Sequence, residues 1–293
     1  MIYEHPLAYV LALEGMALMR SFTGEHDRAF VEARLAEIRR LLDDETLANA
    51  AREVARVSTV DGYRIWSRTY DDANSTFAID EPLIEDIVGG LPAGVALDAA
   101  CGTGRIAALL AGRGHRILGV DSSPDMLAKA RERVPDGDFR PGDLTRLPFP
   151  DGSTDLVVCS LALTHAPSLE PVMAEFARVL RPGGHVVISD IHPEGVARGI
   201  VPPVRLPDGR PGRVATYQHR IGDYVRAALR ANLRVRRCEE PQAADPGPRE
   251  PRPASVEPWD LWPWCLAGFA PEAARAATKG SPTIVVWEFQ LGS

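Results

Sequence analysis

Residues 97–105 read LDAACGTGR, and this stretch decides the fold. The apolar run at 95–100 predicts a buried strand, and the glycines after it predict a tight turn that opens a helix over about 104–112. A glycine-rich turn at a helix N-terminus lets a ligand approach the backbone N–H groups closely. The stretch therefore predicts a binding site for a nucleotide-like ligand.

The rest of the chain alternates between apolar, strand-like runs and helical segments. Further strands are predicted at 116–121, 138–143, 155–160, 185–190, 233–240 and 283–290, and further helices at 124–134, 169–180 and 221–232. This spacing is typical of a parallel sheet with helices on both faces. The predicted fold class is α/β: a Rossmann-like, doubly wound, seven-stranded sheet whose last strand is antiparallel.

The first 60 residues lie outside this alternation, and we expect an N-terminal helical extension (1–60) before the main domain (61–293). The segment 5–20 is apolar but short, contains Glu14 and lacks a basic leader, which argues against a signal peptide or a membrane span. The pattern over 25–57 is also helical. Apolar residues cover most of the first helix, so we expect it to pack against another element or a second copy, giving a homo-oligomer.

Two proline-rich stretches, 192–218 and 239–282, interrupt the alternation after predicted strands. Ligands of open α/β sheets bind at the carboxyl ends of the strands, so both stretches are candidate lids over a substrate. Three tryptophans at 259, 262 and 264 could wall an apolar substrate, or could anchor the loop to the core.

Composition restricts the class of protein. The 293 residues carry a net charge of −7 and no long basic run, which argues against nucleic acid as a partner. The four cysteines form no CxxC pair and the histidines do not cluster, so neither a metal site nor a disulfide framework is expected. We expect a cytoplasmic protein with no membrane partner.

The glycine turn belongs to a longer fingerprint. Gly102 begins a G-x-G-x-x-A pattern, and Asp121 follows it by 19 residues, where a carboxylate can accept hydrogen bonds from ribose hydroxyls. This arrangement predicts an adenosine-containing ligand without identifying it. No tyrosine lies four residues before either lysine, which disfavours a hydride-transferring enzyme of the short-chain type.

Four motifs in order resemble those of the class I S-adenosylmethionine-dependent methyltransferases: LDAACGTGR, LGVDSSPDML, GDLTRLPFPDGSTDLVVCSLALTH and FARVLRPGGHVVISD. The resemblance covers about residues 62–290. It implies S-adenosylmethionine as the cofactor, and it implies the following cofactor-binding residues: Tyr63, Arg68, Tyr70, Asp98, Ala100, Gly102, Gly104, Asp121, Ser122, Met126, Asp143, Leu144, Ser160 and Leu161.

The resemblance also implies a role for each group of these residues. The loop 100–104 would wrap the methionine part, with Asp98 near the ammonium group. Asp121 would take both ribose hydroxyls, with Ser122 and Met126 on the adenine side. Asp143 and Leu144 would meet the adenine edge and face, and the backbone of Ser160 and Leu161 would pass beneath the sulfonium. Tyr63, Arg68 and Tyr70 resemble lid residues, with Arg68 either paired to the cofactor carboxylate or solvated at the surface.

Methyl transfer from a sulfonium is an in-line displacement that needs alignment and, for a hydroxyl or protonated amine, a general base. His165 is the first candidate base and His192 the second, although His165 could instead hold its loop. His219 could cap a helix. The implied function is methylation of an O, N or C nucleophile of a small molecule, such as a secondary metabolite. Alternatives are a peptide or protein substrate, a nicotinamide-dependent oxidoreductase, or a non-catalytic cofactor-binding scaffold.

Overall fold

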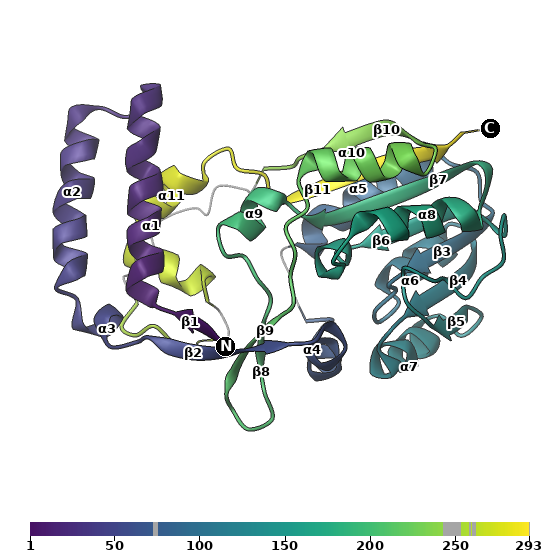
Figure 1. The fold of residues 1–293 in the computed structure, drawn as a ribbon, viewed down its shortest axis with the longest axis horizontal. Coiled ribbons are helices and arrows are strands. Elements are labelled where there is room, and N and C mark those ends of the chain that lie inside the picture. The colour runs from purple at the N-terminus through teal and green to yellow at the C-terminus, as the bar shows by residue number, and fades with distance from the viewer. Residues whose placement is uncertain (73–75, 243–252, 258, 260–261, 293) are drawn as a thin grey trace. The chain divides into compact units, whose positions relative to one another are not determined.

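The computed structural model describes residues 1–72, 76–242, 253–257, 259 and 262–292, and it divides into two compact units (Figure 1). The N-terminal unit comprises residues 1–57, 199–214 and 242–281. The Rossmann-like unit comprises residues 58–198, 215–241 and 282–293. In the described part of the chain, no helix has the length and apolar character needed to cross a membrane.

The Rossmann-like unit is built on a seven-stranded sheet in the order β10-β11-β7-β6-β3-β4-β5. The strands are β3 Val95–Ala99, β4 Arg116–Asp121, β5 Asp138–Pro141, β6 Thr154–Ser160, β7 Leu180–Ile191, β10 Leu233–Glu239 and β11 Ile284–Leu291. Strand β3 pairs parallel with β4 and β6, whereas β11 pairs antiparallel with both β7 and β10. The predicted fold class, including the antiparallel last strand, is confirmed. The last strand lies between β7 and β10 and not at the edge.

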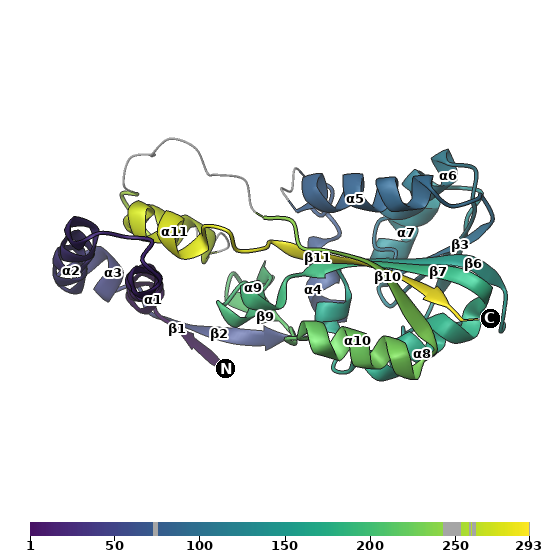
Figure 2. The ribbon, with the colours of Figure 1, turned by 90° about the horizontal axis from the view of Figure 1, so that it is seen from above.

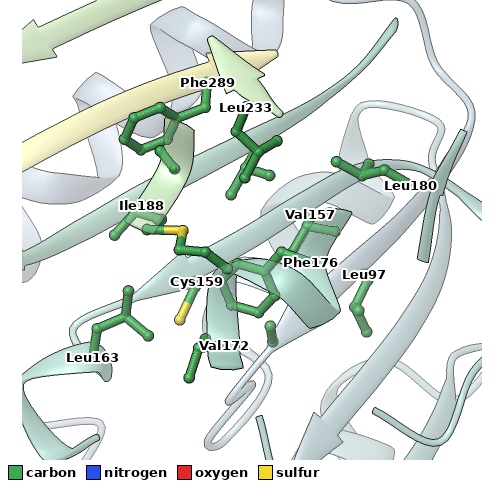
Figure 3. Packing of buried hydrophobic residues seen from close by; sticks show 14 of the residues in the cluster. Leu97, Val157, Cys159, Leu163, Val172, Phe176, Leu180, Ile188, Leu233 and Phe289 are labelled. Carbon is green, nitrogen blue, oxygen red and sulfur yellow. The ribbon is translucent and has the colours of Figure 1, made fainter. Parts of the chain in front are cut away.

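Helices cover both faces of this sheet, as Figure 2 shows from above. The helices of the unit are α4 Thr59–Trp66, α5 Phe77–Gly89, α6 Arg105–Gly112, α7 Pro124–Arg133, α8 Leu169–Val179, α9 Pro193–Ala197 and α10 Ile221–Arg230. Apolar residues of α5, α6 and α7 pack on one face, and those of α8 and α10 pack on the other. Figure 3 shows Phe176 of α8 against Val157 and Cys159 of β6, all fully buried.

The N-terminal unit contains strands as well as helices. Its elements are β1 Ile2–Glu4, α1 Pro6–Met19, α2 Arg28–Leu42, α3 Glu45–Ala48, β2 Arg52–Val57, β8 Pro203–Arg205, β9 Pro211–Val214 and α11 Pro271–Thr278. The prediction of helix throughout 25–57 is wrong at its end, because β2 pairs with β1 and β9 in a four-stranded sheet. The buried residues Val54 and Val57 are three positions apart, a spacing that also fits a helix. The segment is extended because it pairs with strands that are distant in the sequence.

The two proline-rich stretches contribute most of their length to the N-terminal unit. The predicted boundary at residue 60 therefore separates only the first segment of a discontinuous unit. Residues 243–252 of the second stretch lie outside the described residues. Trp259 and Trp262 are each 2% exposed and belong to the core of this unit, whereas Trp264 is 51% exposed. Trp259 and Trp262 thus anchor the loop to a core, as one of the two interpretations of the sequence proposed, and do not wall a substrate site.

Helix α1 is also part of this core. Val10, Leu13 and Ala17 are buried together with residues of α11 and of the segment 262–269. Arg213 stabilises the same unit: its guanidinium lies 4.8 Å from the Trp259 ring centroid and donates to the Trp262 carbonyl at 3.2 Å. The first helix therefore buries its apolar surface against elements of its own chain, and the homo-oligomer remains a prediction.

Candidate cofactor and methyl-transfer site

A cavity of about 230 Å³ lies in the Rossmann-like unit, where the loops after β3, β4, β5 and β6 meet. Ten of the fourteen residues that sequence reasoning assigned to the cofactor line it: Tyr63, Tyr70, Ala100, Gly102, Asp121, Ser122, Asp143, Leu144, Ser160 and Leu161. They come from five separate segments of the chain. The tertiary structure therefore brings most of the predicted site together in one place.

The glycine turn after β3 has the backbone conformation that its sequence predicts. Gly102 and Gly104 have φ values of +52° and +80°, in the left-handed region that favours glycine. A Cβ at Gly104 would lie 3.0 Å from the Cα of Ala130 in α7, so glycine also permits α6 and α7 to pack closely. A Cβ at Gly102 would meet only the Tyr70 ring, at 3.8 Å. Position 102 therefore requires glycine because of its backbone angle, and position 104 requires glycine because of both its backbone angle and the close packing of the helices.

Asp121 ends β4 at the wall of the cavity and joins two turns. One carboxylate oxygen accepts the N–H of Gly102 at 2.9 Å, and the other accepts the N–H of Ser123 at 2.8 Å. Burial raises the pKa of Asp121, while these backbone donors oppose the rise. Each oxygen of a carboxylate has a further lone pair, so the geometry suits two ribose hydroxyls.

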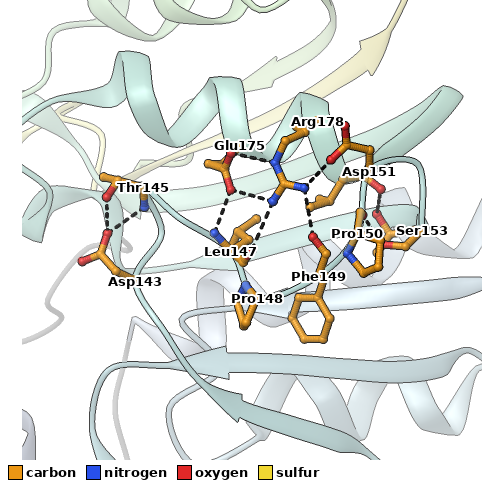
Figure 4. Close-up of polar contacts among 12 residues, drawn as sticks. Asp143, Thr145, Leu147, Pro148, Phe149, Pro150, Asp151, Ser153, Glu175 and Arg178 are labelled. Atoms are coloured by element: carbon orange, nitrogen blue, oxygen red, sulfur yellow. Dashed lines mark hydrogen bonds and ion pairs between the residues drawn. The ribbon is translucent and has the colours of Figure 1, made fainter.

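The loop after β5 is held in place by Arg178 of α8, as Figure 4 shows. The guanidinium donates to the carbonyls of Leu147 and Phe149, at 3.1 and 2.9 Å, and it pairs with Glu175 and Asp151. At the start of the same loop, the Asp143 carboxylate accepts the N–H of Thr145 at 2.7 Å. These contacts fix the segment that carries Asp143 and Leu144 beside the cavity.

Four predicted cofactor residues lie outside the cavity wall. Asp98 is buried and accepts the N–H of Ala107 at 2.8 Å, and burial raises its pKa to about 7. Met126 is fully buried in α7, and Gly104 serves the packing described above. Arg68 is exposed in the turn after α4, so the structure lends no support to its expected contact with the cofactor carboxylate.

Sequence reasoning missed a buried polar cluster beneath this wall. The Asp80 carboxylate of α5 is fully buried and accepts from the Ser160 hydroxyl at 2.6 Å and from the Ser189 hydroxyl at 3.1 Å. Arg105, directly after the glycine turn, pairs with Asp80 at 3.1 Å and donates to Ser160 at 2.8 Å. The cluster fixes the side chain of a cavity-lining residue. In the sequence, the feature that could have indicated this cluster is Arg105, a charged residue at the start of an otherwise apolar helix.

His165 lines the cavity, and both of its ring nitrogens have partners. The Ala215 carbonyl can only accept, so Nδ1 carries the proton and donates to it at 2.6 Å. Nε2 is therefore the acceptor, and the Tyr63 hydroxyl donates to it at 3.0 Å. Burial lowers the pKa of His165. The ring is consequently neutral at pH 7 with its basic nitrogen on the side of Tyr63.

The other two histidines have structural positions. His192, predicted as the second candidate base, is absent from the residues described as lining the cavity. Its Nδ1 accepts the N–H of Glu194 at 3.3 Å as the cap of α9, and its Nε2 lies 2.9 Å from Glu240. The Nε2 of His219 donates to the Ala166 carbonyl at 2.8 Å. The geometry supports His165 alone among these histidines as a base near the cofactor residues.

The residues around the cavity fit a nucleoside-type cofactor, because a glycine turn and two strand-end carboxylates share one wall. The fold and the cavity are thus those expected of a Rossmann-like unit that binds a nucleoside. Residues 97–188 match a family model described as "Methyltransferase domain". This match agrees with the resemblance to the S-adenosylmethionine-dependent methyltransferases, and S-adenosylmethionine is the cofactor which that resemblance implies.

Individual relatives agree with this assignment. The chain is 36% identical over 130 residues to a demethylmenaquinone methyltransferase of Renibacterium salmoninarum, covering 42% of this chain and 55% of that protein. It is 32% identical over 129 residues to a malonyl-[acyl-carrier protein] O-methyltransferase of Serratia marcescens, covering 43% and 51%. The chain thus spans about half the length of these curated relatives.

Solved structures show the same fold. The magnesium protoporphyrin IX methyltransferase of Synechocystis PCC 6803, with bound SAH, superposes with a TM-score of 0.51 over 79% of this chain and 94% of that one. The sequence identity is 18%, so this likeness concerns the fold alone.

Proposed function

We propose that the protein is an S-adenosylmethionine-dependent methyltransferase that transfers a methyl group to an O, N or C nucleophile of a small molecule, such as a secondary metabolite. One observation carries the proposal: ten residues that the sequence assigned to the cofactor, from five segments, line a single cavity that also contains His165. The names of the two curated relatives, which refer to a quinone precursor and a carrier-bound acyl group, support a small acceptor.

The bound cofactor would supply an electrophilic methyl group on a sulfonium. The chain's task is then to align the acceptor and exclude water. Asp121 would hold the ribose through its two oxygens, and the fixed loop after β5 would hold Leu144 against the adenine. The carbonyl and N–H groups of Ser160 and Leu161 would pass beside the sulfonium. His165, neutral and with its basic Nε2 facing Tyr63, would be the final acceptor of the proton of an acidic acceptor molecule.

Binding and turnover measurements separate this function from the alternatives. Isothermal titration with S-adenosylmethionine, S-adenosylhomocysteine and NAD⁺ should give binding of the first two only. Preferred binding of NAD⁺ would favour an oxidoreductase. Incubation with S-adenosylmethionine and a library of small molecules and peptides, followed by mass spectrometry, should then yield S-adenosylhomocysteine with a small acceptor. Binding without product from any acceptor would favour a scaffold protein.

Three further expectations belong to this proposal. The proline-rich stretches 192–218 and 239–282 would contribute to acceptor selection, apart from the tryptophans that lie in the core. The protein would act in the cytoplasm, where its cofactor is made available. It would associate as a homo-oligomer through its N-terminal helices, which light scattering of the full chain tests directly.

A further inference from the structure

Two neutral side chains in the wall of the cavity form a hydrogen-bonded pair. Tyr63 of α4 and His165 of the short 3-10 helix Leu163–His165 both line the cavity, and their polar atoms lie 3.0 Å apart. Their rings meet edge to face, with centroids 5.4 Å apart. Because the Ala215 carbonyl fixes the Nδ1 proton, the chain of hydrogen bonds has one direction: Tyr63 donates to His165, and His165 donates to the backbone.

The surroundings prevent Tyr63 from acting as a base that keeps a negative charge. The groups that act on it electrostatically are Tyr70, Asp121, Asp190 and Cys159, and each is neutral or negative. Burial and these groups hold the pKa of Tyr63 well above its usual range. A proton accepted by the phenolic oxygen must therefore be matched by one released to His165. After donating its hydrogen, that oxygen still has lone pairs with which to accept another.

The walls of the cavity also restrict the acceptor. Among the described residues that line it, none is a lysine or arginine, and the carboxylates are those of Asp121 and Asp143. Both carboxylates already accept backbone N–H groups, and the proposed function assigns both to the ribose and adenine. A carboxylate acceptor would find no basic side chain among these residues, and an ammonium acceptor would find only the two carboxylates already assigned to the cofactor. A neutral acceptor with an acidic hydroxyl suits these walls.

Resting on the proposed function, we propose that Tyr63 is a catalytic residue that relays a proton from a phenolic or enolic hydroxyl of the acceptor to His165. The acceptor O–H bond breaks as its proton passes to the Tyr63 oxygen, and the Tyr63 proton passes to Nε2 of His165. The acceptor's electron pair forms the new bond to the methyl carbon, and the C–S electron pair remains on sulfur. The products are the methylated acceptor, a neutral thioether and a protonated His165, which then loses its proton to solvent.

Charge conservation within the cavity favours this relay. Before transfer the sulfonium carries the positive charge, and a second cation on a buried His165 would be repelled. After transfer the thioether is neutral, and the imidazolium carries the one positive charge. The base therefore becomes stronger as the electrophile is consumed. Ala215 stabilises the imidazolium through its hydrogen bond to Nδ1.

The test uses the full chain with two phenols, 4-methylphenol and 4-nitrophenol, the second largely ionised at mildly alkaline pH. Tyr63→Phe should lower kcat for 4-methylphenol by ~10²–10⁴-fold, the usual contribution of a general base. It should lower kcat for 4-nitrophenol by less than about threefold, because an ionised acceptor has no proton to relay. Tyr217→Phe, which removes an exposed phenol of the same unit, is the matched control.

Each alternative has its own outcome. Equal losses for both phenols, or a loss of S-adenosylmethionine affinity by calorimetry, would assign Tyr63 to the cofactor and overturn the relay. A wild-type protein that binds S-adenosylmethionine but methylates neither phenol would overturn the acceptor class. Absence of cofactor binding would instead refute the proposed function itself, so the two failures are distinguishable.

A spectroscopic readout tests the relay without any acceptor. In protein with ¹⁵N-labelled histidine, the His165 signal is assigned by its loss in His165→Gln. Nε2 should become protonated at a lower pH with S-adenosylmethionine bound than with S-adenosylhomocysteine, because the sulfonium repels the imidazolium. The same midpoint in both complexes would show that the sulfonium and His165 are not coupled, contrary to the proposal.

Discussion

Replacement of Asp121 by alanine tests the cofactor site most directly. The carboxylate accepts two backbone N–H groups, at 2.9 and 2.8 Å, and has one further lone pair on each oxygen for the ribose hydroxyls. A hydrogen bond to a charged group contributes ~1.5–3 kcal/mol. Loss of one ribose contact alone thus costs about tenfold in affinity, and loss of both costs about a hundredfold or more. The freed turn after β3 adds to this cost.

Isothermal titration with S-adenosylmethionine measures the effect, with thermal unfolding as a check that the variant is folded. Asp138→Ala is the matched control, because it removes an exposed carboxylate that pairs with Arg140 in the same unit. We expect Asp138→Ala to bind like the wild type. Asp121→Asn should lie between the two, since an amide retains one acceptor oxygen. A folded Asp121→Ala variant with wild-type affinity would refute the ribose assignment.

Three further predictions concern a base, a core residue and a buried acid. His165→Gln should lower kcat for 4-methylphenol by ~10²–10⁴-fold and change cofactor affinity little; full activity would return His165 to a structural role. Trp262→Ala should destabilise the full chain in urea by ~3–5 kcal/mol, as for a fully buried aromatic, and wild-type stability would contradict its place in the core. Asp190 is buried, and burial raises its pKa from 3.8 to about 7, so the folded protein binds more protons than the unfolded chain between these values. The stability due to this group therefore falls as pH rises towards 7, and Asp190→Asn should show a smaller fall than the wild type in urea titrations at pH 5 and pH 8.

Much of the Rossmann-like unit could be predicted from the sequence because its signals are local. Strand β4 and helix α6 lie within a residue of their predicted bounds, since an apolar run bounded by glycine determines each. Most of the predicted residues that line the cavity could also be found from the sequence, because they lie at or just after the ends of strands. In a parallel sheet, the ends of neighbouring strands meet at one edge whatever the loops between them do.

The tertiary structure alone decided the features that depend on partners distant in sequence. The segment 52–57 became a strand through pairing with residues 211–214, which no local pattern reveals. Asp80 came to lie beneath Ser160, and Ala215 came to fix the tautomer of His165. The sequence determined which side chains stand at the sheet's carboxyl edge, because periodicity and turns act within a few residues. Burial, proton positions and the choice between a core and a catalytic role depend on contacts that form only when the whole chain folds.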